Sequence, residues 1–199
     1  MARIARYDRQ SAIDKAVALF WEKGYYNASI KQIEHALDMR PGSIYAAFGS
    51  KDGLFLEALA CYSRESGDFL TNHLAKSPQV IDGLQAYLRE IASACVSGGP
   101  TPSRACMVVK TLLETSSTHL SINQEVNRVL DSIEQRLGEV LEQAKNNGEL
   151  EAEVDCKRLA RLLQAQIIGL RSFAQRDIGA SDVVELGEDM ARILDSYRV

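Results

Sequence analysis

The sequence predicts an all-α protein of about nine helices, on three observations. Apolar residues recur at spacings of three and four along almost the whole chain, no run alternates apolar and polar residues with β-branched enrichment, and helix-capping residues precede most apolar stretches. With 199 residues, 46% hydrophobic and 25% charged, the chain has the composition of a globular protein with a sizeable core. No apolar run approaches the roughly 20 residues of a membrane span, and none follows the start "MARIARYDRQ", so we expect a cytoplasmic protein with no membrane partner.

The first two helices are delimited by their caps. Asp8 caps a first helix that Gly24 ends, and Ser29 followed by Gln32 has the capping-box pattern that begins a second. The apolar stripes are Ile13, Ala16, Val17 and Phe20 in the first helix, and Ile30, Ile33 and Leu37 in the second.

The stretch "DMRPGSIYAAFGSKDGL" (38–54) predicts a very short third helix. Pro41 fits the first helical position, where its missing N–H is not needed, and this places Arg40 at the cap. Met39 and Ile44 then form a hydrophobic staple, and Ile44 and Phe48 face inward. The opposite face is small and polar, and it consists of Gly42, Tyr45 and Ala46 with Ser43 beside them.

The remaining helices are longer. Ser50 caps a helix through "SKDGLFLEALACYSRESGDFLTNHLAKS", and Pro78, at a first-turn position, opens another that ends near Val96. The stretch "SGGPTPS" (97–103) predicts a flexible break. Four further helices are expected at about 103–116, 121–148, 155–176 and 181–197.

The charge is distributed unevenly. The net charge is −4, but residues 1–52 hold eight Lys and Arg against six Asp and Glu, a balance of +2, which leaves −6 for the rest. Such asymmetry is a weak indication of an end that binds nucleic acid. A short second helix placed by a tight turn, with its N-terminus presented outward, is the helix-turn-helix arrangement that enters a DNA major groove. The amide groups at the starts of the helices after Ser29 and Ser50 are natural phosphate sites.

The stretch from Ser29 to Leu54 resembles the N-terminal domain of the TetR family of transcriptional repressors. "SIKQIEHALDMRPGSIYAAFGSKDGLF" follows that family's order, and "AIDKAVALFWEKGYYNAS" is similar to its first helix, so that the resemblance covers residues 9 to about 58. The chain departs from the family pattern at Asp38 (usually a turn glycine), at Arg40 (usually a small cap) and at Ala46 and Ala47 (often larger polar residues). Because Asp tolerates the left-handed conformation, we expect the turn to be retained.

The resemblance, together with the geometry of the short helix, implies a double-stranded DNA operator as partner. Arg40 and Ser43 are expected to meet base edges, whereas Ser29, Tyr45 and Lys51 hold phosphates. The full set of expected DNA contacts is Ser29, Lys31, Arg40, Pro41, Gly42, Ser43, Tyr45 and Lys51. We accordingly divide the chain into a DNA-binding domain (1–50) and a ligand-binding and dimerisation domain (51–199).

A homodimer and a small-molecule inducer are also expected. Palindromic operators require two DNA-binding domains related by a two-fold axis. The last two helices carry broad apolar stripes that suit a four-helix interface between two copies, as the resemblance also implies. The candidate dimerisation residues are Leu159, Leu163, Ile167, Leu170, Val184, Met190 and Leu194. A small, largely apolar inducer is expected in a cavity within residues 55–175, with candidate lining residues Phe69, His73, Tyr87, Ile91, Cys106, Met107, Lys110 and Phe173.

There are three alternative functions. An enzyme is disfavoured because His35, His73 and His119 show no triad or metal-ligand spacing, and we expect no cofactor and no metal. A helical adaptor that has lost DNA binding fits the acidic total, but Tyr45, Lys51 and an arm with Arg3, Arg6 and Arg9 count against it. A thiol-based sensor of electrophiles or oxidants would use Cys106, near a helix start with Arg104 and Lys110 close by. The four cysteines form no CxxC pair, which indicates neither a zinc site nor a disulfide framework.

Overall fold

The structure of the protein, a computed structural model, describes residues 8–97 and 106–199. These ranges contain nine α-helices, one 3₁₀ helix and a single isolated bridge between Leu150 and Arg198, which confirms the all-α prediction. The elements are α1 (Arg9–Lys23), α2 (Ile30–Leu37), α3 (Pro41–Phe48), α4 (Lys51–Leu74), α5 (Val80–Val96), α6 (Met107–Thr115), α7 (Leu120–Asn146), α8 (Cys156–Phe173), α9 (Ala180–Ile193) and η1 (Leu194–Tyr197).

The predicted caps of the first helices are present. The side chain of Asp8 accepts a hydrogen bond from Gln10 N, and Gly24 ends α1 with a positive φ of 81°. Ser29 and Gln32 form both bonds of the capping box at the start of α2, and Ser50 Oγ accepts from Gly53 N at the start of α4. These helix starts are therefore specified by residues within one turn of each cap.

Other helix starts differ from the prediction. Helix α5 begins at Val80, two residues after Pro78, because the carboxylate of Glu149 accepts from Val80 N (3.0 Å) and Ile81 N (2.9 Å). Helix α7 begins at Leu120, just before Ser121, and α6 begins at Met107, with Cys106 at the N-cap position and no capping bond from its side chain. Most of the predicted break (97–103) and Arg104 lie outside the described residues.

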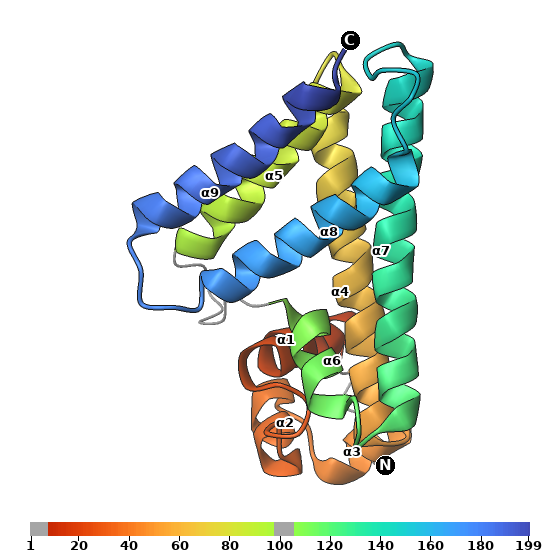
Figure 1. The fold of residues 1–199 in the computed structure, drawn as a ribbon. Helices are drawn as coiled ribbons and strands as arrows, with labels where there is room; N and C mark the ends of the chain where they lie inside the picture. The colour runs from red at the N-terminus through yellow and green to blue at the C-terminus, as the bar shows by residue number, and fades with distance from the viewer. Residues whose placement is uncertain (1–7, 98–105) are drawn as a thin grey trace.

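Two hydrophobic cores share the two longest helices (Figure 1). The first, which we call the N-terminal core, joins α1–α3 with the first half of α4, α6 and the first half of α7. The second, the C-terminal core, joins α5, α8 and α9 with the second half of α7 and Leu70 of α4. Hydrophobic packing thus crosses residue 50, and the N-terminal core includes Leu54, Phe55, Met107 and Ile122.

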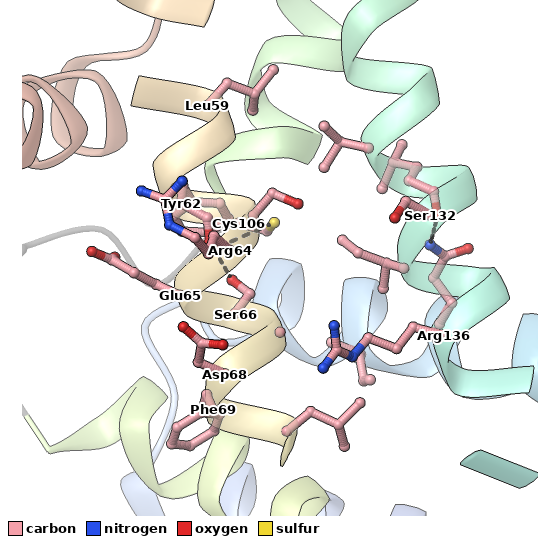
Figure 2. A pocket seen from close by; sticks show the side chains of 18 of the residues that line it. Leu59, Tyr62, Arg64, Glu65, Ser66, Asp68, Phe69, Cys106, Ser132 and Arg136 are labelled. Carbon is pink, nitrogen blue, oxygen red and sulfur yellow. Dashed lines mark hydrogen bonds between the residues drawn. The ribbon is translucent and has the colours of Figure 1, made fainter. Parts of the chain in front are cut away.

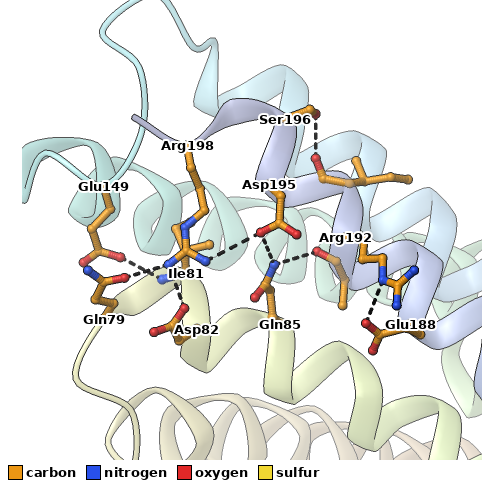
Figure 3. Close-up of polar contacts among 12 residues, drawn as sticks. Gln79, Ile81, Asp82, Gln85, Glu149, Glu188, Arg192, Asp195, Ser196 and Arg198 are labelled. Carbon is orange, nitrogen blue, oxygen red and sulfur yellow. Dashed lines mark hydrogen bonds and ion pairs between the residues drawn. The ribbon is translucent and has the colours of Figure 1, made fainter.

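Helices α5 and α9 lie side by side, at the left of Figure 1, and polar contacts fix their ends. The amide of Gln85 donates to Ala191 O (3.0 Å) and to Asp195 Oδ1 (2.8 Å), and Arg198 forms an ion pair with Asp82 (2.7 Å; Figure 3). Midway along the pair, a Cβ at Gly187 would lie 2.3 Å from Cβ of Ala92, so only glycine permits this approach. Within the described ranges, no helix is both long and apolar enough to cross a membrane.

Candidate nucleic-acid interface and ligand pocket

Helix α3 has the two faces that the sequence predicts. Ile44 and Phe48 are buried in the N-terminal core, and Pro41, Gly42, Ser43 and Tyr45 are exposed, with Tyr45 at 47%. Nothing in the described structure lies within 4 Å of a Cβ built at Gly42. The outer face of α3 is therefore open to a flat or convex surface.

The turn before α3 depends on one residue in the left-handed region. Asp38 has φ 53° and ψ 45°, and its backbone N–H donates a hydrogen bond to His35 O at the end of α2. It is the only non-glycine residue with positive φ in the part of the chain described here. The expectation that Asp38 retains the turn is thus confirmed.

The residues at the entrance to α3 remain exposed. Arg40 precedes Pro41 in an extended conformation and makes no capping bond with its side chain. Ser29 and Lys31, at the start of α2, are also exposed. The backbone N–H of Ser29 donates to Gln32 Oε1 (2.8 Å) within the capping box, whereas the exposed side chains of Lys31 and Arg40 are available to an external phosphate.

Lys51 is placed differently from the expectation of an exposed phosphate contact. It begins α4, but its ammonium lies over the ring of Tyr25, 4.6 Å from the centroid, and burial lowers its pKa. The Tyr25 hydroxyl donates a short hydrogen bond to Asp52, which also pairs with His119 at 3.0 Å. Lys51 is thus part of a cluster that fastens the exit of α1 to the starts of α4 and α7.

The side chain of Arg9 is also held by contacts within the protein. Its guanidinium pairs with Glu57 at 2.5 Å, donates to Ala47 O and lies over the ring of Phe48 at 4.8 Å. These contacts fix the start of α1 against α3 and α4. The other arginines of the predicted arm, Arg3 and Arg6, lie outside the described residues.

A pocket lies between α4, α5, α7 and α8 (Figure 2). Its cavity volume of about 690 Å³ falls in the range of small-molecule sites. The walls are mainly apolar, and charged side chains such as Arg64, Glu65 and Asp68 lie near its α4 side. The apolar wall residues include Leu59, Phe69, Leu70, Ile91, Val129, Ile133, Leu137, Ile167 and Ile168.

Four of the eight predicted ligand residues line this pocket: Phe69, Tyr87, Ile91 and Cys106. The other four do not line it, and each has another contact. Met107 is fully buried in the N-terminal core, and the ammonium of Lys110 donates to Trp21 O at 2.9 Å. The ring of His73 packs against those of Phe69 and Tyr87, with its Nδ1 2.8 Å from Phe69 O. Phe173 is exposed beneath the guanidinium of Arg176. Helical periodicity identified the right segments but not which side of each helix meets the cavity.

Sequence reasoning missed several polar residues of the pocket, namely Trp21, Tyr62, Gln164 and Arg171. The Tyr62 hydroxyl donates to Cys106 Sγ at 3.4 Å, and burial raises the pKa of Tyr62. Arg171 gave a signal in the sequence, since it follows Ile167 by four residues and so places a cation beside an apolar stripe.

Helix α6 connects the pocket to the N-terminal helices. Cys106 at its start lines the pocket, and Lys110 holds the end of α1 through Trp21 O. One turn later, a carboxylate oxygen of Glu114 accepts from Tyr25 N at 2.8 Å, close to Gly24. Helix α6 thus contacts both the pocket and the end of α1.

The predicted dimerisation residues lie mostly inside the protein. Leu159, Leu163, Leu170, Met190 and Leu194 are buried in the C-terminal core, and Ile167 is partly buried at the pocket. Because α8 and α9 pack their most apolar stripes against α5 and α7, those stripes are not free for a partner. Of the predicted set, only Val184 is exposed, at 44%. The other large apolar residues that α8 leaves exposed are Leu162 and Phe173.

One group in the described structure brings three potential metal ligands together: Asp14, Cys61 and Glu65. Here the thiol of Cys61 is buried between the two carboxylates and donates to Glu65 at 3.6 Å. Burial, reinforced by the charge of Glu65, raises the pKa of this thiol, which favours its protonated form. The geometry is that of a hydrogen-bonded thiol linking α1 and α4.

Comparisons with known proteins agree with this architecture. Residues 12–58 match the family model described as bacterial regulatory proteins, tetR family, and residues 81–178 match one described as tetracyclin repressor-like, C-terminal domain. The chain is 26% identical over 189 residues to the HTH-type transcriptional repressor ComR of Escherichia coli (strain K12), covering 94% of this chain and 89% of that protein.

Solved structures are similar over nearly the whole length. A CifR cysteine mutant, a TetR family transcriptional regulator in complex with 26-bp operator DNA, aligns with a TM-score of 0.85 at 29% identity, covering 96% of this chain and 98% of that one. A TetR regulator from Chloroflexus aurantiacus aligns with a TM-score of 0.82 at 25% identity, covering 96% of each chain. With both halves of the chain matched and a helix-turn-helix exposed at one end, the protein belongs to the TetR family of DNA-binding transcriptional regulators.

Proposed function

We propose that the protein is a repressor that binds a palindromic operator as a homodimer and releases it when a small molecule fills the pocket. The observation that carries the proposal is the open outer face of α3, held rigidly by the buried Ile44 and Phe48. A relative that is named a repressor and a similar structure bound to operator DNA support the same function.

On the DNA, the two roles of the contacts separate by position. Arg40 and Ser43, at the start of α3, are proposed to meet base edges, with Pro41 and Gly42 allowing close approach. Ser29, Lys31 and Tyr45 flank them and are proposed to hold phosphates. Lys51 is proposed to act chiefly by fixing the start of α4, because its ammonium is occupied by the Tyr25 ring.

The homodimer is proposed to form through the outer faces of α8 and α9. Leu162, Phe173 and Val184 are the large apolar side chains exposed there, and Gly169 lies between the first two with nothing within 4 Å of a built Cβ. A two-fold axis through this surface pairs the same helices of two copies into a four-helix contact. The interface differs from the predicted one in using the exposed Leu162 and Phe173 of α8 in place of the buried Leu163 and Leu170.

We propose that the ligand releases the operator through movements of α4 and α6. From Lys51 to Phe69, α4 spans about 27 Å, at 1.5 Å per residue, and so connects the helix-turn-helix to the pocket wall. Helix α6 connects Cys106 in the pocket to Tyr25 and Trp21 at the end of α1. A coupling free energy of about 1–3 kcal/mol between the ligand pocket and the DNA-binding helices is typical of allosteric proteins.

The DNA proposal is tested by operator binding, with the duplex taken from the promoter region next to the gene. Arg40→Ala should relax discrimination between operator and scrambled duplex by about 1–3 kcal/mol if the contact to guanine is bidentate. Tyr45→Phe should weaken binding to both duplexes alike, because a phosphate contact carries no sequence information. Fluorescence anisotropy over a salt series measures both effects, and Lys157→Ala, an exposed cation on α8, is the matched control. Unchanged operator affinity in both variants would contradict the assignment.

A second function is favoured by the position of Cys106, which lines the pocket at the start of α6 and accepts a hydrogen bond from Tyr62. We propose as the alternative that electrophiles or oxidants release the operator by modifying this thiol. Cys61, Cys95 and Cys156 are buried and serve as internal controls. Mass spectrometry after alkylation of the native protein should find one modification, at Cys106, together with weaker operator binding. If Cys106 remains unmodified, or if its modification leaves operator affinity unchanged, the thiol is part of the pocket wall only.

A further inference from the structure

The pocket contains a cation, Arg171, with which no carboxylate of the described residues forms an ion pair, although Glu65, Asp68 and Glu125 also line the pocket. Arg171 of α8 belongs to the pocket lining, and no described residue forms an ion pair or hydrogen bond with its guanidinium. The residues outside the described ranges, 1–7 and 98–105, contain no Asp or Glu, so no side-chain carboxylate among them can pair with it either. Guanidinium stays protonated in proteins, and its positive charge is therefore left unbalanced beside an apolar wall.

The other arginines of the pocket differ from Arg171. Arg128 pairs with Glu125 at 2.5 Å, and Arg136 donates to Thr71 Oγ1 at 2.5 Å. Arg64 is exposed. All three are exposed, whereas Arg171 is partly buried, and we call their position the rim of the pocket.

The groups around Arg171 are neutral hydrogen-bonding groups. Tyr62, Tyr87 and Cys106 line the pocket together with Arg171, and these three and Cys95 interact with it electrostatically. Burial raises the pKa values of both tyrosines, so the phenols stay protonated at neutral pH. The Tyr87 hydroxyl has no hydrogen-bond partner among the described residues, although its ring packs on Phe69. A guanidinium fork beside a free phenol O–H is a donor set that matches the two oxygens of a carboxylate.

We propose that the ligand of this pocket is an amphiphilic monocarboxylate, bound with its carboxylate on Arg171 and its apolar body against Phe69, Ile91 and Ile133. A cavity of about 690 Å³ with one interior cation suits a single negative charge on a mostly apolar molecule. The regulatory role of this ligand rests on the proposed function, in which the ligand releases the operator. Binding of the ligand to the pocket does not, because it can be measured without DNA.

The experiment uses the single tryptophan as reporter. Trp21 lines the pocket with its ring 5.3 Å from that of Tyr62, so its fluorescence responds to occupancy. The probes are octanoate and 4-phenylbutanoate, each titrated beside the primary alcohol of the same skeleton. We expect each acid to bind about tenfold to a hundredfold more tightly than its alcohol, which is the range for a hydrogen bond to a charged group.

The variants locate the preference. Arg171→Gln should abolish the difference between acid and alcohol while leaving alcohol binding unchanged, and Arg171→Lys should restore part of it. Tyr87→Phe should reduce acid binding less than Arg171→Gln does, and Arg136→Gln at the rim should keep the full preference. Thermal unfolding shows whether each variant is folded. If Arg171→Gln does not fold, the ratio of acid to alcohol affinity in the unmodified protein still tests the proposal.

Three results would overturn the inference: equal affinity for acid and alcohol, an acid preference that survives Arg171→Gln, or no binding of either acid up to its solubility limit. Operator release is then measured separately by anisotropy. An acid that binds in the pocket but does not release the operator contradicts the proposed ligand response and leaves the ligand class intact.

Discussion

At the scale of single residues, the left-handed Asp38 decides how α3 is presented. Its side chain stands where a glycine would be unstrained, and a non-glycine residue in this region costs roughly 1–2 kcal/mol. Asp tolerates the position better than most residues because its short side chain can hydrogen-bond locally.

We therefore predict a rank order of stability at position 38. Asp38→Gly should change the free energy of unfolding by no more than about 1 kcal/mol, because relief of strain is offset by the greater backbone entropy of glycine. Asp38→Val should lower it by more than that, because a β-branched side chain is poorly accommodated at positive φ. Urea unfolding measures the order, and a Val variant as stable as the unmodified protein would show that the turn adopts another conformation.

At the scale of helices, the close contact between α5 and α9 depends on Gly187. An added methyl group would collide with Cβ of Ala92, and relieving the clash requires that the two helices move apart. We predict that Gly187→Ala lowers the free energy of unfolding by about 1–3 kcal/mol, the usual cost of overpacking.

Gly138 in α7 provides the matched control. A Cβ there would lie 3.8 Å from Cβ of Ala160, an ordinary contact. Gly138→Ala should therefore stabilise the protein by up to about 1 kcal/mol through helix propensity alone. Equal effects of the two substitutions in urea unfolding would mean that α5 and α9 are not packed as described.

The same scale shows what local sequence can specify. Asp8, Ser29 and Ser50 act within one turn, so they predicted the starts of α1, α2 and α4 correctly. The start of α5 was misplaced at Pro78 because its cap, Glu149, is 69 residues away from Val80. Met107 and Lys110 were assigned to the pocket for a similar reason: periodicity gives the apolar face of α6 but not that this face belongs to the N-terminal core.

At the scale of the whole molecule, the exposed face of α8 and α9 should determine the oligomeric state. Leu162 is 40% exposed on this face, and burial of an introduced charge there would oppose association. We predict that Leu162→Glu shifts the protein from dimer to monomer in light scattering at micromolar concentration without loss of helical content.

Leu113 offers a control of the same chemistry. It is 75% exposed on α6, away from the proposed interface, so Leu113→Glu should leave the mass unchanged. A monomeric mass for the unmodified protein, or a dimer that withstands Leu162→Glu, would contradict the proposed surface.

The N-terminal core has a further consequence for how such a protein can be modified or evolve. Helices α1–α3 pack in one core with Phe55 of α4, and Met107 of α6 and Ile122 of α7, which lie far beyond the helix-turn-helix in the sequence, complete that core. A fragment cut after residue 58 would leave this apolar surface uncovered, and a chimaera that joins α1–α3 to another ligand domain would have to rebuild it. The DNA specificity of the protein therefore cannot be changed by exchanging α1–α3 alone. Such an exchange requires matching changes in the residues of α6 and α7 that pack against these helices.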